Sequence, residues 1–537
     1  MLRRLWRAET GVFLCVWIFL LLAGHRGALV RDPGIFWHRV VGERILATGE
    51  FLRPEMRTDA FSCTRAGQPW IAQQWLAECA MAVLYRIGGL DSLVLATATI
   101  LAALHAWIAH RIIREGFHWL FGVLLALLFF FASVYHFHPR PHLATIVLLG
   151  WTFARLCDVE NGRRSLHSLI WLIPMFILWT NLHGGVLGGM ATTAMVVIGW
   201  VLARGLGLPS PLSGFRDFAF AGGLVVACAL TALVNPYGTH LLEVWRSLSN
   251  SPTLREFMIE HQPLNPGEQG GRAVLVFGFI YVVVLAGSWP TFPRITSFIP
   301  LIWLYLACTS IRHGPLFAVT AAVGLADLLP RTRFAELLKN HAPGLYTERS
   351  AVPPSTTTAP RLSIFNLQSS FLRCRSMLFP TCLVLTSLIL QHFAIPVPLL
   401  GRGSACLDPN YWPEEVLPEL EKLPNGTAIF NDMLFGGYII AYCPNLHVFI
   451  DDRCELYGDR FIREYFETER DHPARLEQWA EEFGLQYALV RSDSELNPSP
   501  FDRYLRDALN WKQIKRTPAG TLYGRIQPTG RNEQPEP

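Results

Sequence analysis

Charged residues are scarce in this chain. They make up 16% of its 537 residues, whereas a soluble domain carries about 25%. Hydrophobic residues account for 51% of the sequence, and the mean hydropathy is +0.28. This composition excludes an ordinary soluble globular protein and indicates that much of the chain lies in a membrane.

Several chemical signatures are missing as well. The 11 cysteines form no CxxC pair and show no metal-type spacing, which excludes the usual zinc and redox motifs. Cys443 and Cys454 can form a disulfide if their domain lies in an oxidising compartment. No Walker A, GxGxxG, HExxH or GxSxG motif occurs in a matching context. No A-x-A-like cleavage site follows the first apolar run, so we expect that run to be a retained span.

Long apolar runs recur along the chain. A membrane span needs about 20 mostly apolar residues, and eleven segments approach that length. Cytoplasmic loops favour Lys and Arg. The N-terminal MLRRLWR and the loops on its side carry such charge, which places the N-terminus in the cytoplasm and the C-terminal region outside it. The predicted spans are 8–26, 92–110, 116–135, 142–157, 165–182, 184–203, 217–234, 273–288, 296–311, 314–329 and 377–395.

The segment 70–89 allows two interpretations. Its sequence, WIAQQWLAECAMAVLYRIGG, is long enough for a twelfth span. On a helical wheel, however, Trp70, Gln74 and Glu78 share one face and apolar residues share the other, which is typical of a helix lying at the membrane interface. A span here would also invert every later loop. We therefore favour an interfacial helix.

Charge divides the chain into two parts. Residues from 397 onward contain 15 Lys and Arg against 23 Asp and Glu, whereas the preceding residues contain 31 against 19. Strand-like and helix-like segments alternate near the C-terminus, which favours a small extracytoplasmic α/β domain. The strand-like segments are 427–430, 446–453, 487–493 and 521–526. We expect an α-helical transmembrane domain at 1–340 with a first extracytoplasmic loop at 27–91, a disordered cytoplasmic linker at 341–376, a last span at 377–396, the α/β domain at 405–527 and a disordered tail at 528–537.

Polar residues that are unusual for a membrane protein gather at the predicted outer ends of spans. Ionisable groups at such depths are costly and suggest a functional site. In HPRPH, the two prolines can simply shape a turn, but a fixed guanidinium at Arg140 suits a phosphate. The polar groups are Asp32, His38, HFHPRPH (136–142), NLHGG (181–185), NPYG (235–238) and SIRHG (310–314).

Structural explanations compete with function at each of these positions. Asp32 before Pro33 fits a helix N-cap. Arg39 and Glu43, four residues apart, can pair on a helix surface. NPYG fits a turn at the end of a span, and Arg312 can lie in a solvated turn.

Several longer motifs resemble a family of bacterial polytopic membrane proteins that is usually grouped with the GT-C membrane glycosyltransferases, such as protein O-mannosyltransferases and the aminoarabinose transferases of lipid A. The resemblance covers nearly the whole chain, but that family brings no assigned activity with it. The motifs are DPGIFWHRVVGERILATGEF, RPHLAT, LWTNLHGG, NPYGTHLL, IRHGPLFA, FGGYIIAY and VFIDDRCELYG.

The GT-C resemblance implies a polyprenyl-phosphate sugar donor, an acid in the first loop as general base, and basic residues that bind the donor phosphate. Asp32 matches the first-loop acid, but the Asp-Glu pair of O-mannosyltransferases and the Asp-x-Asp of oligosaccharyltransferases are absent. Glu43, Glu55 and Asp59 are alternative acids. The implied phosphate ligands are Arg140, His142, Arg312 and His313, and the implied cavity residues are His38, Glu43, Asp59, His138, Asn181 and His183.

Three functional hypotheses follow from these observations. The first is a glycosyltransferase in the bacterial inner membrane that acts on an extracytoplasmic glycan, lipid or protein. The second is a non-catalytic scaffold for envelope or exopolysaccharide assembly. The third, a lipid or solute transporter, predicts charges near mid-membrane, whereas the charges here gather at span ends. Membrane lipids are expected partners and nucleic acid is not. No cofactor is expected, a divalent metal stays open, and the sequence does not fix the oligomeric state.

Overall fold

The computed structural model describes residues 7–290, 293–348, 377–396, 403–495 and 498–526. Most of the predicted linker and the tail at 528–537 lie outside these residues. The chain forms two compact units, which we describe separately. The first unit consists of Met1–His25, Leu84–Gly238 and Ile259–Ser404, and the second consists of Arg26–Val83, Thr239–Met258 and Ala405–Pro537.

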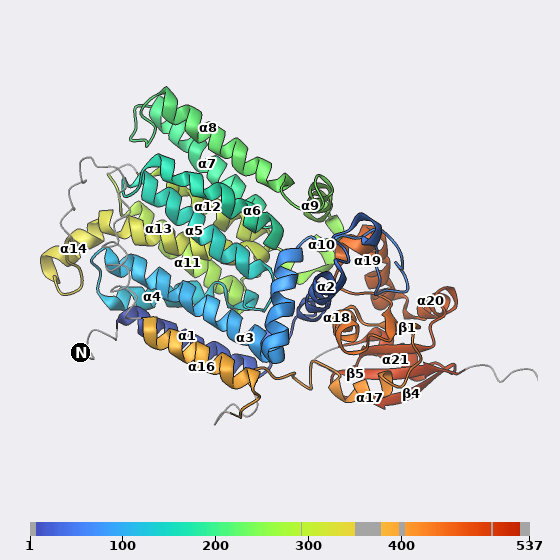
Figure 1. The fold of residues 1–537 in the computed structure, drawn as a ribbon. Helices are drawn as coiled ribbons and strands as arrows, with labels where there is room; N and C mark the ends of the chain where they lie inside the picture. The colour runs from blue at the N-terminus through green and yellow to red at the C-terminus, as the bar shows by residue number, and fades with distance from the viewer. Residues whose placement is uncertain (1–6, 291–292, 349–376, 397–402, 496–497, 527–537) are drawn as a thin grey trace, which may run out of the picture. The chain divides into compact units, whose positions relative to one another are not determined.

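The first unit is a bundle of helices (Figure 1). Helices α1 and α16 come from the two ends of this unit's sequence and lie side by side (Figure 1). The helices are α1 (Ala8–His25), most of α3 (Trp75–Arg114), α4 (Trp119–Phe131), α5 (His142–Glu160), α6 (Leu172–Leu182), α7 (Val186–Gly205), α8 (Phe215–Leu230), α11 (Gln269–Ala286), α12 (Ile299–Thr309), α13 (Gly314–Leu328), α14 (Arg333–His341) and α16 (Leu378–His392).

The predicted spans all contain helices. Within the described residues, seven helical segments are long and apolar enough to cross a membrane. Shorter apolar helices at Trp119–Phe131, Leu166–Leu182, Ile295–Thr309 and Leu378–His392 account for the other four predicted spans. The protein is therefore a polytopic α-helical membrane protein, as the sequence predicts.

Helix α13 lies at the centre of the bundle. It is the most buried of the seven candidate spans and packs against α4, α5, α11 and α12. Small residues line it, and they allow neighbouring helices to approach closely. A Cβ atom on Gly324, for example, would lie 2.9 Å from the hydroxyl of Tyr281.

Helix α3 is kinked where the ambiguous segment ends. Gly89 has a φ of +63°, a left-handed conformation that glycine adopts without steric cost. The kink separates the helical residues before Gly88 from the long span that follows. The helical part of segment 70–89 therefore runs only from Trp75 to the kink, which is shorter than the twelfth span considered above. Its location at the membrane interface stays a prediction.

The second unit contains a five-stranded mixed sheet in the order β2-β1-β3-β5-β4. Strands β2, β1 and β3 are parallel, whereas β5 runs antiparallel to both β3 and β4. The predicted C-terminal α/β domain is thus confirmed. Its elements are β1 (Thr427–Asn431), α18 (Met433–Tyr442), β2 (Leu446–Val448), α19 (Cys454–Asp471), α20 (Leu476–Glu482), β3 (Tyr487–Arg491), α21 (Pro500–Asp507), β4 (Trp511–Arg516) and β5 (Gly520–Arg525).

Some details of this domain differ from the sequence analysis. The strand expected at 446–453 ends at Val448, because the backbone amides of Phe449 and Ile450 donate to the side chain of Asn431 instead of a neighbouring strand. Cys443 and Cys454 are both free thiols.

The first loop folds with the C-terminal domain. Helix α2 (Gly34–Thr48) packs against α18, and a Cβ atom on Gly437 would lie 2.3 Å from the carbonyl oxygen of Pro33. Trp412 donates its indole N–H to the carbonyl of Val30 at 2.8 Å. The sequence analysis placed 27–91 in the transmembrane domain. The structure instead groups residues 26–83 with the sheet. The sequence analysis missed this grouping because contacts between residues far apart in the chain leave no local pattern.

Two short helices between membrane spans also belong to the second unit. They are α9 (His240–Asn250) and α10 (Pro252–Phe257), and both pack against α19. The rings of Phe257 and Phe466 stack with centroids 5.0 Å apart, and Arg463 pairs with Glu256 at 2.7 Å.

A completely buried arginine joins the first loop to the C-terminal domain. Arg453 pairs with Asp59 at 2.7 Å through Nη1 and with Asp451 at 2.7 Å through Nη2. Tyr457 donates its hydroxyl to Asp451 at 2.9 Å, and the guanidinium lies 4.8 Å from the ring of Trp70. Burying a charge is costly unless it is paired and hydrogen-bonded. The buried charge of Arg453 therefore needs a carboxylate from the first loop as well as one from the C-terminal domain.

Replacing Arg453 by Met should destabilise the second unit by about 3–5 kcal/mol, because two carboxylates would stay buried without their cation. Proteolysis of the full-length protein across a urea series would measure the change. Arg470→Met is the matched control, since Arg470 is exposed on α19 beside Asp471 and should change little. Equal stabilities for the two variants would contradict the role assigned to Arg453.

Candidate functional site

Four segments of the first unit bring basic side chains together at one end of the bundle. The segment before α5 supplies His136, Arg140 and His142; the turn between α6 and α7 supplies His183; the turn before α11 supplies His261; and the turn before α13 supplies Arg312. We call these residues, together with Glu260, the basic cluster. His142 donates Nε2–H to the carbonyl of His136 at 2.6 Å, and Arg312 donates to His261 at 2.7 Å.

The hydrogen bonds around His183 fix its tautomer. The backbone N–H of Gly185 donates to Nδ1 at 3.0 Å, and Thr145 lies 2.8 Å from the same nitrogen. Thr145 accepts from the indole N–H of Trp179, so its own hydroxyl is left to donate to Nδ1. Burial, with the charges of neighbouring His142 and Arg312, holds the pKa of His183 well below its usual range. The ring is therefore neutral, with its proton on Nε2 as a hydrogen-bond donor.

A second histidine of the cluster has an unsatisfied atom. Nδ1 of His136 is buried and has no hydrogen-bond partner among the described residues. Burial, then the nearby His142, lower the pKa of His136 well below its usual range. Because an unpaired buried polar atom is costly, this nitrogen is a position where a ligand or a water molecule would be stabilising.

Glu260 is the acid of the basic cluster. Its carboxylate lies 3.8 Å from Nε2 of His261, the nitrogen that accepts from Arg312. Partial burial would raise the pKa of Glu260, but the charges of Arg312 and Arg140 outweigh it and hold that pKa well below its usual range. The Glu260 side chain stays 48% exposed, so the charges are the decisive influence. Glu260 is thus an internal counter-ion for the two arginines.

Three long helices begin at the cluster. Helix α5 starts at His142, α7 at Val186 and α13 at Gly314, and no side chain caps any of these three N-termini. The N-terminus of a helix carries partial positive charge, which favours anions. Together with the two arginines, these N-termini make this end of the bundle suited to a phosphate.

Other residues predicted for this site make contacts of their own. His138 lies close enough to influence His136 electrostatically. His313 donates Nδ1–H to the carbonyl of Leu306 at 3.2 Å, toward α12. The amide of Asn181 donates to the carbonyls of Ile177 and Val234 and thereby joins α6 to the NPYG turn.

Asp32 lies directly before α2 in the second unit. Its Oδ1 accepts from the backbone N–H of Gly34 at 2.8 Å, and its carbonyl accepts from Ile35 at 3.4 Å. The helix begins at Gly34 with Pro33 at the N-cap, one residue later than predicted. Even so, the carboxylate binds the first amide as a cap would. Burial, then the charge of Asp32, raise the pKa of Tyr411 to about 12, so the Tyr411 phenol stays protonated beside Asp32.

The remaining predicted residues of the second unit are engaged in its packing. Nδ1 of His38 lies 2.9 Å from the carboxylate of Glu78, and both side chains are buried. Glu43 pairs with Arg39 at 3.2 Å, as the sequence predicts. Asp59 is the partner of Arg453 described above and also accepts from the hydroxyl of Ser62 at 2.7 Å.

The sequence analysis missed Glu260, His261 and Tyr411 as neighbours of the candidate residues. Glu260 and His261 lie in a short 3-10 turn, Ile259–His261, between an amphipathic segment and a span. Their one local signal is an acid next to a histidine just before an apolar run, which is common in ordinary loops.

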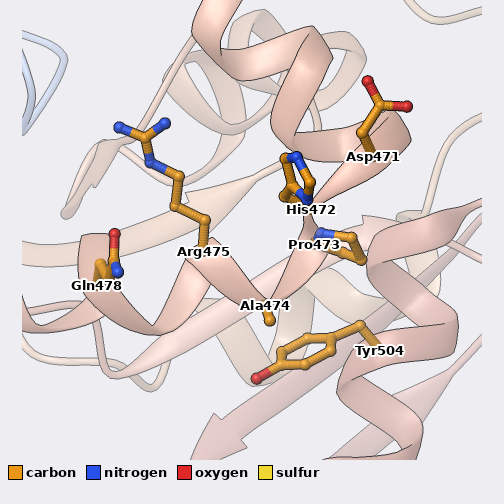
Figure 2. A pocket seen from close by; sticks show the side chains of 7 residues that line it. All are labelled: Asp471, His472, Pro473, Ala474, Arg475, Gln478 and Tyr504. Carbon is orange, nitrogen blue, oxygen red and sulfur yellow. The ribbon is translucent and has the colours of Figure 1, made fainter.

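A cleft in the C-terminal domain lies apart from all predicted residues. It has a volume of about 560 Å³ and is formed by the end of α19, the turn at 472–475, and α20 and α21. Figure 2 shows Arg475 and Tyr504 on its walls. Arg475 pairs with Glu464 at 2.5 Å, and Tyr504 donates to Glu477 at 3.2 Å. These contacts are internal to the domain and give no indication of a ligand.

Within the described residues, no group of three or more His, Cys, Asp and Glu side chains is arranged to hold a metal ion. The basic cluster, with two arginines, several histidines and one acid, is likewise a poor cation site. Its chemistry favours an anion.

Comparisons with known proteins give a structural likeness but no family or curated relative. No family model matches the chain, and no curated protein matches it. The solved structure of ArnT from Cupriavidus metallidurans in the apo state is similar to it, with 14% identity, coverage of 96% of both chains and a TM-score of 0.48. ArnT is an aminoarabinose transferase of the GT-C class, the class that the sequence motifs resemble. A likeness of this degree supports no conclusion about the reaction of this chain.

Replacing Glu260 by Gln should strengthen the binding of a small anion to the basic cluster, because the arginines lose their internal counter-ion. For a half-exposed pair the expected gain is about two- to fivefold. Titration of the purified protein with inorganic pyrophosphate would measure it. Glu268→Gln, at the N-cap of α11, is the control and should leave the affinity unchanged. Weaker binding in Glu260→Gln would instead show that Glu260 positions the arginines.

Proposed function

We propose that this protein is a membrane glycosyltransferase of the GT-C class that takes a sugar from a polyprenyl-phosphate donor. The observation that carries the proposal is the basic cluster, in which Arg140, Arg312 and a neutral His183 gather where three helices begin. A lipid-linked donor fits a phosphate site at the end of membrane helices, since its polyprenyl chain stays in the bilayer. The acceptor is proposed to be an extracytoplasmic glycan, lipid or protein of a bacterial cell envelope.

The proposed mechanism is the attack of an acceptor hydroxyl on the sugar of the lipid-linked donor. The acceptor hydroxyl loses its proton to Asp32 and attacks the anomeric carbon of the sugar. The bond between that carbon and the phosphate oxygen breaks, and negative charge develops on the lipid phosphate. Positioned donors stabilise such charge, and the proposed donors are the guanidinium groups of Arg140 and Arg312 and Nε2–H of His183.

The local structure of Asp32 suits a base. One carboxylate oxygen of Asp32 accepts from the backbone N–H of Gly34, which sets the orientation of the carboxylate. General-base catalysis requires a carboxylate that is oriented in this way and is within hydrogen-bond reach of the acceptor hydroxyl. The capping role and the proposed catalytic role are therefore compatible.

The phosphate-binding part of the proposal predicts that Arg140→Ala and Arg312→Ala each weaken the binding of polyprenyl phosphate by about tenfold or more, because each removes a charge-assisted hydrogen bond to the phosphate. Binding would be measured with the protein in nanodiscs. Arg272→Ala is the matched control, because Arg272 is exposed near the start of α11 and has no contact with the basic cluster. Unchanged binding in both cluster variants would exclude the proposed site.

The catalytic part predicts that Asp32→Asn lowers the turnover number for sugar transfer by about 10²–10⁴-fold. Asn and Asp cap helices about equally well, so the thermal stability and the affinity for polyprenyl phosphate should not change. Transfer from labelled polyprenyl-phosphate sugar would be measured in membranes. Glu50→Gln, in the same loop but paired with Arg44, is the control. Full activity in Asp32→Asn would exclude Asp32 as the general base and leave helix capping as its role.

A further inference from the structure

A second charged cluster lies at the opposite end of the same helices. It forms where α3 and α5 end, where α13 ends and where α12 begins. We call it the arginine network. It contains Arg111, Arg114, Arg155, Arg163, Arg164, Arg294 and Arg331, together with Glu115, Asp158, Glu160 and Asp327.

The acids Asp158 and Asp327 hold the centre of the arginine network. Arg111 is 3% exposed and lies 3.4 Å from Asp158 and 3.2 Å from Asp327. Arg163 lies 2.9 Å from Asp158 and 2.7 Å from Asp327. Arg114 and Arg164 also approach Asp158, at 3.3 and 3.8 Å. Four arginines thus share two aspartates, with Glu115 contributing at the edge.

Glu160 does not supply a further carboxylate to the arginines. Its two oxygens accept from the backbone of Ile295 at 2.8 Å, from the backbone of Thr296 at 2.9 Å and from the hydroxyl of Thr296 at 2.6 Å. The Glu160 carboxylate therefore caps the start of the α12 region. The balance of the network is seven arginines against four acids.

Three arginines have no carboxylate partner among the described residues. Arg155 lies 4.6 Å from the ring of Trp151. Arg294 donates to the backbone carbonyl of Glu160, and Arg331 donates to the side-chain oxygen of Asn161. The stretches of the first unit outside the described residues contain no Asp or Glu, so they supply no missing carboxylate.

Arg294 and Arg331 converge on consecutive residues at the end of α5. A helix C-terminus attracts cations, which accounts for the contact of Arg294 with a carbonyl. A carbonyl or an amide oxygen does not neutralise a guanidinium, however. Nε of Arg294 is also buried without a hydrogen-bond partner among the described residues. Two guanidinium groups at one position, neither of which is within ion-pair distance of a carboxylate among the described residues, favour an external anion.

Exposed tryptophans surround the arginine network. Trp119 begins α4, five residues after Arg114, and is 51% exposed. Trp171 precedes α6 and is 69% exposed, and Trp289 lies between α11 and Arg294 and is 71% exposed. Tryptophan is enriched at the level of lipid headgroups. The three tryptophans therefore place this end of the bundle at a membrane surface, where the available anions are lipid phosphates.

We propose that the arginine network binds the phosphate of an anionic phospholipid headgroup, with Arg294 and Arg331 as its principal ligands. The site is separate from the basic cluster at the other helix ends and does not depend on the proposed glycosyltransferase activity. By the positive-inside rule this end faces the cytoplasm, where anionic lipids attract juxtamembrane basic residues.

The test compares lipids on the full-length protein. Native mass spectrometry of the wild type should show retained phosphatidylglycerol and little phosphatidylcholine. Arg294→Ala/Arg331→Ala should lower phosphatidylglycerol retention by about 25-fold, since each basic residue near a lipid surface contributes about fivefold. Arg331→Ala alone should lower phosphatidylglycerol retention about fivefold. Because it changes an exposed side chain, it still tests the site if the double variant misfolds. Arg204→Ala, an exposed arginine at the end of α7, is the matched control.

Two results would overturn the proposal. One is equal retention of phosphatidylglycerol by the wild type and both variants. The other is displacement of phosphatidylglycerol by low millimolar inorganic phosphate in the wild type, which would show a site for a free anion. Resistance to inorganic phosphate, combined with the graded loss in the variants, would establish a lipid headgroup site.

Discussion

Hydrocarbon offers no hydrogen-bond partner to a peptide group or a charge, and this constraint decides where the chain keeps its ionisable residues. The helices of the first unit satisfy their own backbone groups along their length. Their unpaired amides and carbonyls remain at the ends, and the charged side chains gather there too. The basic cluster and the arginine network are the two ends of one bundle, and helices α5 and α13 run from one to the other. The ionisable groups of these two helices are therefore concentrated at their ends.

The two ends solve the problem of concentrated positive charge differently. At the basic cluster, His136 and His183 are kept neutral, because burial and neighbouring charge lower their pKa values. The positive charge there comes from arginines, whose single acid is the half-exposed Glu260. At the arginine network, Asp158 and Asp327 are built into the helices and neutralise a buried core. The acid of the basic cluster is thus half-exposed, whereas the two central aspartates of the arginine network are mostly buried between its arginines.

The sequence predicted the features that leave a regular local pattern, which are the apolar membrane helices and the strands with apolar residues. Apolar runs located a helix in each of eleven spans, and strand-like runs located β1, β3 and β5. Strand β4 was missed because its residues, WKQIKR, are mostly polar and exposed, so no apolar alternation marks it. Arg140, His142, His183 and Arg312 were noticed because each lies in a short polar motif directly beside an apolar run. Glu260 and the pairing of Asp59 with Arg453 were not, because they depend on residues that meet only after the chain folds.

The association of the first loop with the C-terminal domain gives that domain a physical role. Helix α2 has little support from its own sequence neighbours. Trp37 donates to Asp452 at 2.7 Å and Arg39 donates to the carbonyl of Ala441 at 3.1 Å, while Gly437 packs against the carbonyl of Pro33. Because the carboxylate of Asp32 is tied to the first amide of α2, its orientation depends on these contacts. The C-terminal domain thus positions the proposed base whether or not it also touches an acceptor.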